Sequence, residues 1–89
     1  MYEKIKHVFA DVARETGVTE TEIRGRGRQK WSVVARQECM RRLRDDYKLS
    51  YSEIAMFCKR FTAGAVIHGI RRARARLKDG TYLVRDDGI

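Results

Sequence analysis

The sequence predicts an all-α fold of five or so helices, and its 89 residues suffice for one small domain. Three observations support this class. Apolar residues recur at helical spacing along most of the chain, proline is absent, and capping-box pairs precede two of the periodic segments. Apolar residues make up 43% of the chain and charged residues 36%, which fits a compact helical protein.

The first part of the chain contains one long predicted helix and one short one. An apolar stripe over residues 5–13 predicts the long helix, and Gly17 is well placed to end it. Thr19 and Glu22 have the spacing of a capping box, which predicts a short helical turn. The segment "RGRGR" at 24–28 has two glycines too close together for a stable helix, so we expect a basic loop there.

Two further helices follow the loop. The first is predicted from about Gln29 to Asp46, and its inward-facing residues are Trp31, Val34, Ala35, Cys39 and Leu43. Ser50 and Glu53 form a second capping box, which opens the next helix. The buried side of that helix is expected to contain Ile54, Ala55, Phe57 and Cys58.

The last predicted helix runs from about Ala63 to Leu77, with Thr62 as its N-cap. Its inner face contains Val66, Ile70, Ala73 and Leu77. A short helix, a turn and a longer basic helix are the parts of a helix-turn-helix. We therefore expect one helix-turn-helix domain over residues 1–78 and a short extended tail over 79–89, in which residues 81–84 form a strand or an arm.

The positive charge is concentrated in two segments. Residues 24–44 hold eight basic residues and one acid, and residues 59–78 hold seven basic residues and no acid. The rest of the chain has five basic and eleven acidic residues, within a net charge of +8. Two basic segments on an otherwise acidic chain indicate a surface for a polyanion, although a solvated basic face without a partner has the same pattern.

Several classes of function are disfavoured by what the sequence lacks. Cys39 and Cys58 fall at apolar helical positions and are expected to be buried free thiols, and His7 and His68 do not complete a metal site with them. We find no apolar run long enough for a bilayer, no signal peptide, and no spacing of side chains typical of a catalytic site. The expectation is a cytoplasmic, non-enzymatic protein without a cofactor or a metal.

Five segments carry a resemblance to a known family. In order along the chain they are "TGVTETEI", "RGRGRQK", "ARQECMRRL", "LSYSEIAMFC" and "AVIHGIRRA". With them, residues 5–77 resemble the C-terminal DNA-binding domain of the bacterial replication initiator DnaA, a member of the Trp-repressor-like helical group. The sequence contains no phosphate-binding loop of the type that an initiator's ATP-binding module needs, so only the DNA-binding module is expected.

The resemblance implies contacts with double-stranded DNA at matching positions. Arg28 matches an arginine that enters the minor groove, with Lys30 close behind it, although a phosphate contact or no contact is also open for Arg28. Positions that lie along the DNA backbone match Arg36, Gln37, Arg44, Tyr51 and Ser52. Arg36 can instead brace the fold through an ion pair.

The start of the last helix departs from the family pattern. Thr62-Ala63-Gly64-Ala65 stands where the family has Asp-His-Thr-Thr, the residues that read base edges. The two alanines can press on thymine methyl groups and Gly64 permits close approach, but they lack the bidentate hydrogen bonds worth roughly 1–3 kcal/mol per base pair. Recognition of the initiator's own DNA boxes is therefore not expected. His68 can reach a base or a phosphate, or can pack on the domain.

The sequence thus favours a small DNA-binding protein, a transcriptional regulator of bacterial or phage origin. Its last helix would lie in a major groove, with Arg71 and Arg72 among the phosphate contacts. If six to eight phosphates are engaged, log K should fall against log salt with a slope of about −5 to −7. The alternatives are a weakly specific architectural DNA binder, a module that binds another protein, and an RNA-binding protein.

Overall fold

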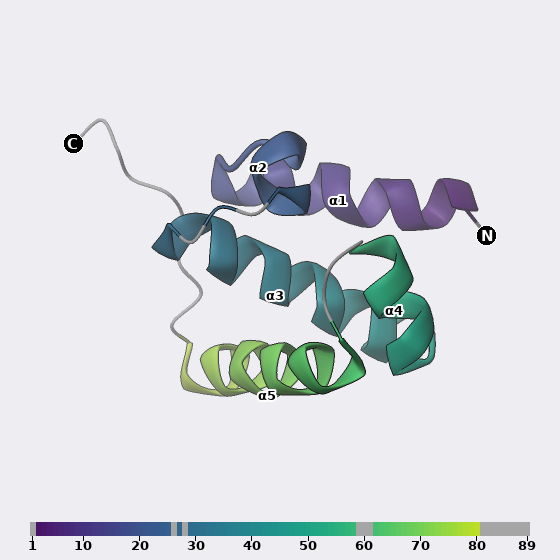
Figure 1. Cartoon of the computed structure of the whole chain (residues 1–89). Coiled ribbons are helices and arrows are strands. Elements are labelled where there is room, and N and C mark those ends of the chain that lie inside the picture. The colour runs from purple at the N-terminus through teal and green to yellow at the C-terminus, as the bar shows by residue number, and fades with distance from the viewer. Residues whose placement is uncertain (1, 26, 28, 59–61, 81–89) are drawn as a thin grey trace.

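The computed structural model describes residues 2–25, 27, 29–58 and 62–80, without the side chains of residues 2 and 4 (Figure 1). Its helices are α1 (Tyr2–Thr16), α2 (Glu20–Arg24), α3 (Lys30–Asp45), α4 (Tyr51–Phe57) and α5 (Ala63–Asp79). The described residues contain no strand. The predicted all-α helix-turn-helix fold is therefore confirmed, whereas the strand or arm predicted for residues 81–84 lies outside the described residues.

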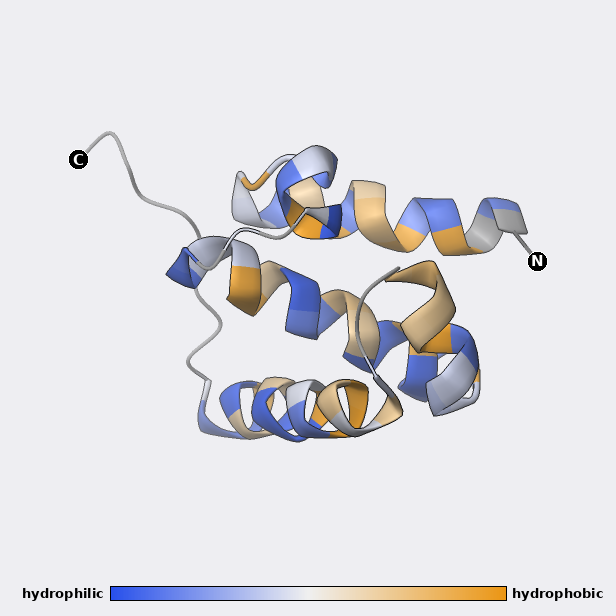
Figure 2. Ribbon diagram, in the orientation of Figure 1, coloured by the Kyte–Doolittle hydropathy of each residue, from blue (hydrophilic) through white to orange (hydrophobic). Residues whose placement is uncertain are grey.

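Helix α3 is the centre of the fold. It contacts all four other helices and lies between α1 and α5 (Figure 1). Hydrophobic and hydrophilic residues alternate along both α1 and α3 (Figure 2). The side chains that are almost fully buried come from all five helices and include Ile5, Phe9, Val12, Ile23, Cys39, Leu43, Ile54, Val66 and Ile70. Because α3 packs against every other helix, the positions of its two ends fix where the loop before it ends and the loop after it begins.

Capping hydrogen bonds confirm three of the predicted helix starts, those of α2, α4 and α5. The Ser50 hydroxyl accepts from the Glu53 amide at 3.1 Å, and the Glu53 carboxylate accepts from the Ser50 amide at 3.0 Å. The Thr62 hydroxyl accepts from the Ala65 amide at 3.2 Å, and Thr19 caps α2 in the same way. These caps satisfy amides that have no partner within a helix, and so fix where α2, α4 and α5 begin.

Three residues with positive φ end helices. Gly17 (φ 77°) follows α1, as predicted, and Gly80 (φ 69°) caps α5. The third is Lys48 (φ 59°), which is not a glycine. Its amide donates to the Arg44 carbonyl at 3.1 Å, and the Leu49 amide donates to the Leu43 carbonyl at 3.2 Å. This left-handed turn directs the chain from α3 toward α4.

One residue of the predicted core is exposed. Leu77 shares the helical face of Val66, Ile70 and Ala73, but its relative exposure is 55%. The prediction that Leu77 faces inward is therefore wrong. Helical periodicity fixes the face on which a side chain lies, whereas burial also requires a neighbouring element, and no described element buries Leu77. Trp31, Ala55 and Phe57 pack against the core but are only half-buried.

Candidate nucleic-acid interface

The N-cap and first turn of α5 present small side chains to solvent. Thr62, Ala63, Gly64 and Ala65 are all exposed, and the only side-chain hydrogen-bonding group among them is the Thr62 hydroxyl. That hydroxyl accepts from the Ala65 amide as the helix cap. The surface of this turn therefore consists mainly of methyl groups and backbone, which allows a groove of DNA to approach closely.

Polar side chains begin one turn further along α5. His68, Arg71 and Arg72 are exposed, and Arg72 Nε donates to His68 Nε2 at 3.0 Å. His68 therefore lies at the surface and orients Arg72, and it does not pack within the domain.

A shallow, mostly apolar groove of about 200 Å³ separates α5 from α3. Its lining residues are Val33, Arg36, Gln37, Met40, Ala65, His68 and Gly69. A Cβ atom at Gly69 would lie 3.0 Å from Met40 Sδ and 3.3 Å from Gln37 Cγ, so the glycine lets the two helices cross closely. Arg76 Nη1 donates to Gln37 Oε1 at 2.6 Å. The structure thus brings four predicted contact residues together, namely Arg36, Gln37, Ala65 and His68.

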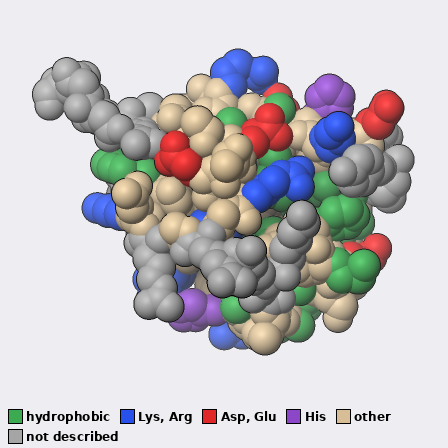
Figure 3. Space-filling model, turned by 45° about the horizontal axis from the view of Figure 1, so that its top comes forward, with side chains coloured by type: hydrophobic (Ala, Val, Ile, Leu, Met, Phe, Trp, Pro, Cys, Tyr) green, Lys and Arg blue, Asp and Glu red, His purple; other side chains and the backbone are tan. Residues whose placement is uncertain are grey.

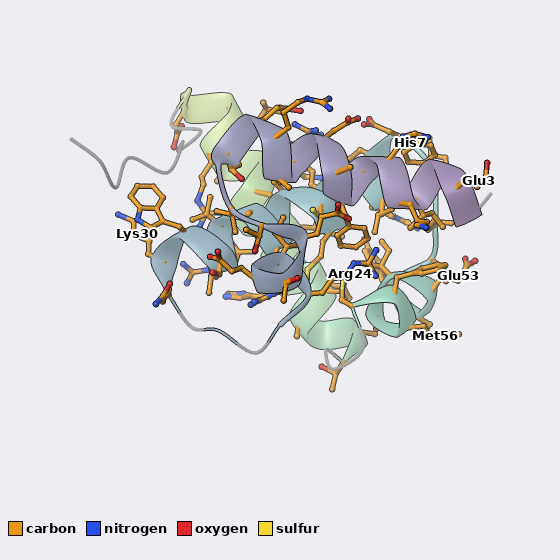
Figure 4. The ribbon with its side chains drawn as sticks, turned by 90° about the horizontal axis from the view of Figure 1, so that it is seen from above. Glu3, His7, Arg24, Lys30, Glu53 and Met56 are labelled. Carbon is orange, nitrogen blue, oxygen red and sulfur yellow. The ribbon has the colours of Figure 1, made fainter. Side chains whose placement is uncertain are left out.

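Other predicted contact residues lie at the two ends of α3. At its C-terminal end, Arg44 Nη1 donates to the Leu49 carbonyl at 2.9 Å, and the guanidinium carbon lies 4.4 Å from the centre of the Tyr51 ring. Ser52 is exposed beside them. At the N-terminal end, Lys30 is exposed, far from Glu53 and Met56 of α4 (Figure 4). Arg28 lies outside the described residues.

With this geometry established, comparison with known families is informative. Residues 5–73 match the family described as the bacterial dnaA protein helix-turn-helix. The chain belongs to this family. No curated protein and no solved structure matches it significantly. The matched range contains α1 from Ile5 onward, all of α2, α3 and α4, and the first eleven residues of α5, so the exposed turn at Ala63–Ala65 lies within the DnaA helix-turn-helix region. Membership of a DNA-binding family supports DNA as the partner of this chain.

Arg36, which the DnaA resemblance placed on the DNA backbone, is only 5% exposed. Its Nε donates to the Ile23 carbonyl at 2.7 Å. Its Nη2 lies within hydrogen-bonding distance of the carbonyls of Glu22 (3.2 Å), Gly25 (2.9 Å) and Gly27 (3.2 Å). Burial lowers the pKa of this guanidinium. The buried location of Arg36 argues against the predicted phosphate contact. Arg36 instead braces the fold, and the described bonds that do so go to backbone carbonyls, whereas the alternative prediction had an ion pair.

Three other arginines of the basic segments belong to a network of ion pairs. Arg41 and Arg42 both donate to the buried Glu38 carboxylate, at 2.8 Å and 2.7 Å for the shortest bonds. Arg42 also pairs with Glu15 of α1 at 2.8 Å, which lowers the Glu15 pKa. Asp45 pairs with Arg74 of α5, and with Arg41 at 3.5 Å. Three arginines and three acids thus form a neutral network, in which Arg41 and Arg42 are largely buried and Arg74 stays exposed.

The spacing of charged residues in α3 predicts part of this network, although a count of basic and acidic residues per segment does not reveal it. Glu38 precedes Arg41 and Arg42 by three and four residues, the spacing at which side chains meet on a helix. Arg24 was also counted as a loop cation, but it ends α2, and its guanidinium carbon lies 4.1 Å from the centre of the Phe9 ring (Figure 4). On the α1 side of the molecule acidic and basic side chains alternate (Figure 3).

The cysteines and the remaining titratable groups form no second site. Cys39 and Cys58 are buried free thiols, as predicted, and burial raises the pKa of Cys58 to about 11. Among the described residues, no group of three His, Cys, Asp or Glu side chains could hold a metal ion. No helix in the described part of the chain is long and apolar enough to cross a membrane.

Proposed function

We propose that this protein is a small transcriptional regulator, bacterial or phage in origin, that binds double-stranded DNA in the cytoplasm. In this proposal α5 lies in a major groove and the basic loop after α2 reaches the adjacent minor groove. The observation that carries it is the exposed start of α5 in a DnaA-family helix-turn-helix, followed by the exposed cations Arg71 and Arg72.

The proposed contacts divide into two kinds. Base edges would be approached by Ala63, Gly64, Ala65 and His68, and the minor groove by Arg28. Phosphates would be contacted by Lys30, Gln37, Arg44, Tyr51, Ser52, Thr62, Arg71 and Arg72. The exposed positions of Lys30 and Ser52 suit this assignment, and the partly buried Arg44 over Tyr51 is held in one orientation. Phosphate contacts fix the register of the protein on DNA, whereas base contacts specify sequence.

The number of phosphate contacts is smaller than the sequence charge implies. Arg36, Arg41, Arg42 and Arg74 are engaged within the protein. If the five proposed cationic contacts, Arg28, Lys30, Arg44, Arg71 and Arg72, each neutralise one phosphate, log K should fall against log salt with a slope of about −4.5. A slope steeper than about −7 would mean that the internal ion pairs open on DNA.

The composition of the first turn favours a second possibility, a weakly specific architectural binder. Ala63, Gly64 and Ala65 offer no side-chain hydrogen bonds to base edges, so discrimination would depend on methyl contacts and groove width. Selection from a random duplex library separates the two. Enrichment of one sequence supports the regulator, and a flat profile supports the architectural binder.

The direct test of DNA binding is fluorescence anisotropy with a labelled duplex at low salt. Arg71→Ala and Arg72→Ala should each weaken binding several-fold, because each removes a cation beside the proposed groove. Arg14→Ala is the matched control, since Arg14 is an exposed arginine on α1 that pairs with Asp11. Wild-type protein that fails to bind at micromolar concentration would exclude the proposal and favour a protein partner instead.

A further inference from the structure

The loop between α2 and α3 is held by one side chain from the second turn of α3. Arg36 donates to four carbonyls, two in the last turn of α2 and two in the loop. The two loop carbonyls belong to Gly25 and Gly27, which flank residue 26 and precede residue 28. The described bonds of Arg36 thus connect α3 both to the end of α2 and to the middle of the loop.

The guanidinium is suited to this arrangement. It is planar, carries five N–H donors in a fixed fork, and stays charged when buried. The carbonyls of Glu22 and Ile23 lie at the C-terminal end of α2, where a helix leaves carbonyls without partners and favours a positive charge. A lysine in the same place would present a single ammonium group and could not reach carbonyls on both sides.

The loop backbone is also confined sterically. A Cβ atom at Gly25 would lie 3.0 Å from the Thr21 carbonyl oxygen and 3.6 Å from that of Glu22. The chain therefore leaves α2 close to its own last turn, which only glycine tolerates without a shift. At Gly27 a Cβ would meet nothing nearer than Ser32 Oγ at 3.8 Å, so there the Arg36 bond, and not space, determines the backbone position.

We propose that Arg36 is a positioning residue for DNA recognition, which orders the backbone of the basic loop before DNA arrives and does not touch DNA itself. This inference rests on the proposed DNA-binding function. A loop that is already ordered in the free protein loses less conformational entropy when it binds, and the binding affinity is higher for that reason. Minor-groove recognition depends on placing an arginine in a narrow groove, so it should respond most to loss of this order.

The test compares Arg36→Lys with Arg42→Lys. Both keep the charge and replace a mostly buried arginine of α3, but Arg42 pairs with Glu15 and Glu38 and has no described contact with the loop. Amide hydrogen exchange without DNA at Gly25, whose N–H donates to the Glu22 carbonyl at 3.3 Å, reports the order of the loop where it leaves α2. Faster exchange in Arg36→Lys and unchanged exchange in Arg42→Lys is the expected result, and unchanged exchange in Arg36→Lys would overturn the proposal.

Binding is then measured on two duplexes, one with an A-tract and one rich in G·C, at a temperature where circular dichroism shows every variant folded. Arg36→Lys should weaken A-tract binding about tenfold, which is about 1.4 kcal/mol, and reduce the preference for the A-tract. Arg42→Lys should keep that preference.

A double mutant separates positioning from direct contact. If Arg36 acts through the loop, Arg36→Lys should have a much smaller effect in an Arg28→Ala background than in wild type. Additive effects, or equal weakening on both duplexes, would make Arg36 a phosphate contact and overturn the proposal. If the proposed DNA-binding function itself is wrong, wild-type protein will bind neither duplex, whatever the exchange data show. That result is distinct from the outcomes that would overturn the positioning role of Arg36.

Discussion

Replacing Glu38 by alanine removes the carboxylate on which two arginines of α3 converge. Glu38 is 4% exposed, and the side chains of Arg41 and Arg42 are 13% and 18% exposed. Arg41 donates to both carboxylate oxygens, at 3.0 Å and 2.8 Å, and Arg42 donates to one of them at 2.7 Å. The substitution would leave two largely buried cations without this partner.

The expected cost follows from that geometry. Breaking a buried ion pair by removing one partner costs about 3–5 kcal/mol, because a charge stays buried without compensation. Here each arginine keeps a second carboxylate, Asp45 for Arg41 and Glu15 for Arg42, so we expect the lower end, about 3 kcal/mol. A domain of this size loses about 4–8 °C in Tm per kcal/mol, which gives a fall of roughly 12–24 °C.

Thermal unfolding followed by circular dichroism at 222 nm measures this change, and urea unfolding gives the free energy independently. Glu38→Gln should fall between wild type and Glu38→Ala, since it keeps an acceptor and loses the charge. Glu20→Ala is the control, because Glu20 is an exposed acid in α2. A Tm for Glu38→Ala within about 4 °C of wild type would refute the reasoning, since about 1 kcal/mol is typical of an exposed ion pair.

Three further predictions concern the turn after α3, the thiols and the acid stability. Lys48→Gly should raise the free energy of unfolding by about 1 kcal/mol, because Lys48 has φ 59° and glycine adopts this conformation without strain. In native protein at pH 8 Cys39 and Cys58 should react far more slowly with Ellman's reagent than in denaturant, since both are buried and the Cys58 pKa is raised to about 11. Ion pairing lowers the pKa values of Glu15 and Asp45, whose ordinary values are 4.5 and 3.8, so their stabilisation is present above about pH 4.5 and is lost as pH falls further.

Each of the three has a clear contrary outcome. A lower Tm for Lys48→Gly would mean that the lysine side chain contributes more than the backbone conformation costs. Rapid labelling of two thiols in native protein would contradict the buried positions of the cysteines. For the acid prediction, the double variant Glu15→Gln, Asp45→Asn should lose less Tm between pH 5 and pH 3 than wild type does, and equal losses would contradict it.

The parts of this fold that the sequence predicts are those that depend on local contacts. The capping box at Ser50, the caps at Thr19 and Thr62, and the glycine end of α1 all involve residues within a few positions of each other. Their hydrogen bonds form wherever a helix begins or ends, whatever packs against it. For this reason the order and number of the helices could be predicted without knowledge of their packing.

The sequence alone does not show which charged side chains are buried within the fold and which are exposed. Arg36 and Arg71 are both cations of basic helices, but one is buried under a loop and the other is exposed. That difference depends on α2 ending beside α3, a contact between residues far apart in sequence. The prediction that Leu77 faces inward is wrong for a related reason, because burial requires a neighbouring element. The DNA contacts themselves remain predictions, to be tested by the variants described above.

The bonds of Arg36 have a consequence for how this protein could be altered. The described bonds are made to main-chain oxygens at Glu22, Ile23, Gly25 and Gly27. Exchange of the residues at positions 26 and 28 leaves these four acceptors in place, because they are backbone carbonyls of other residues. A library randomised at those two positions, with Gly25 and Arg36 kept, should yield many folded proteins that differ mainly in the DNA they prefer.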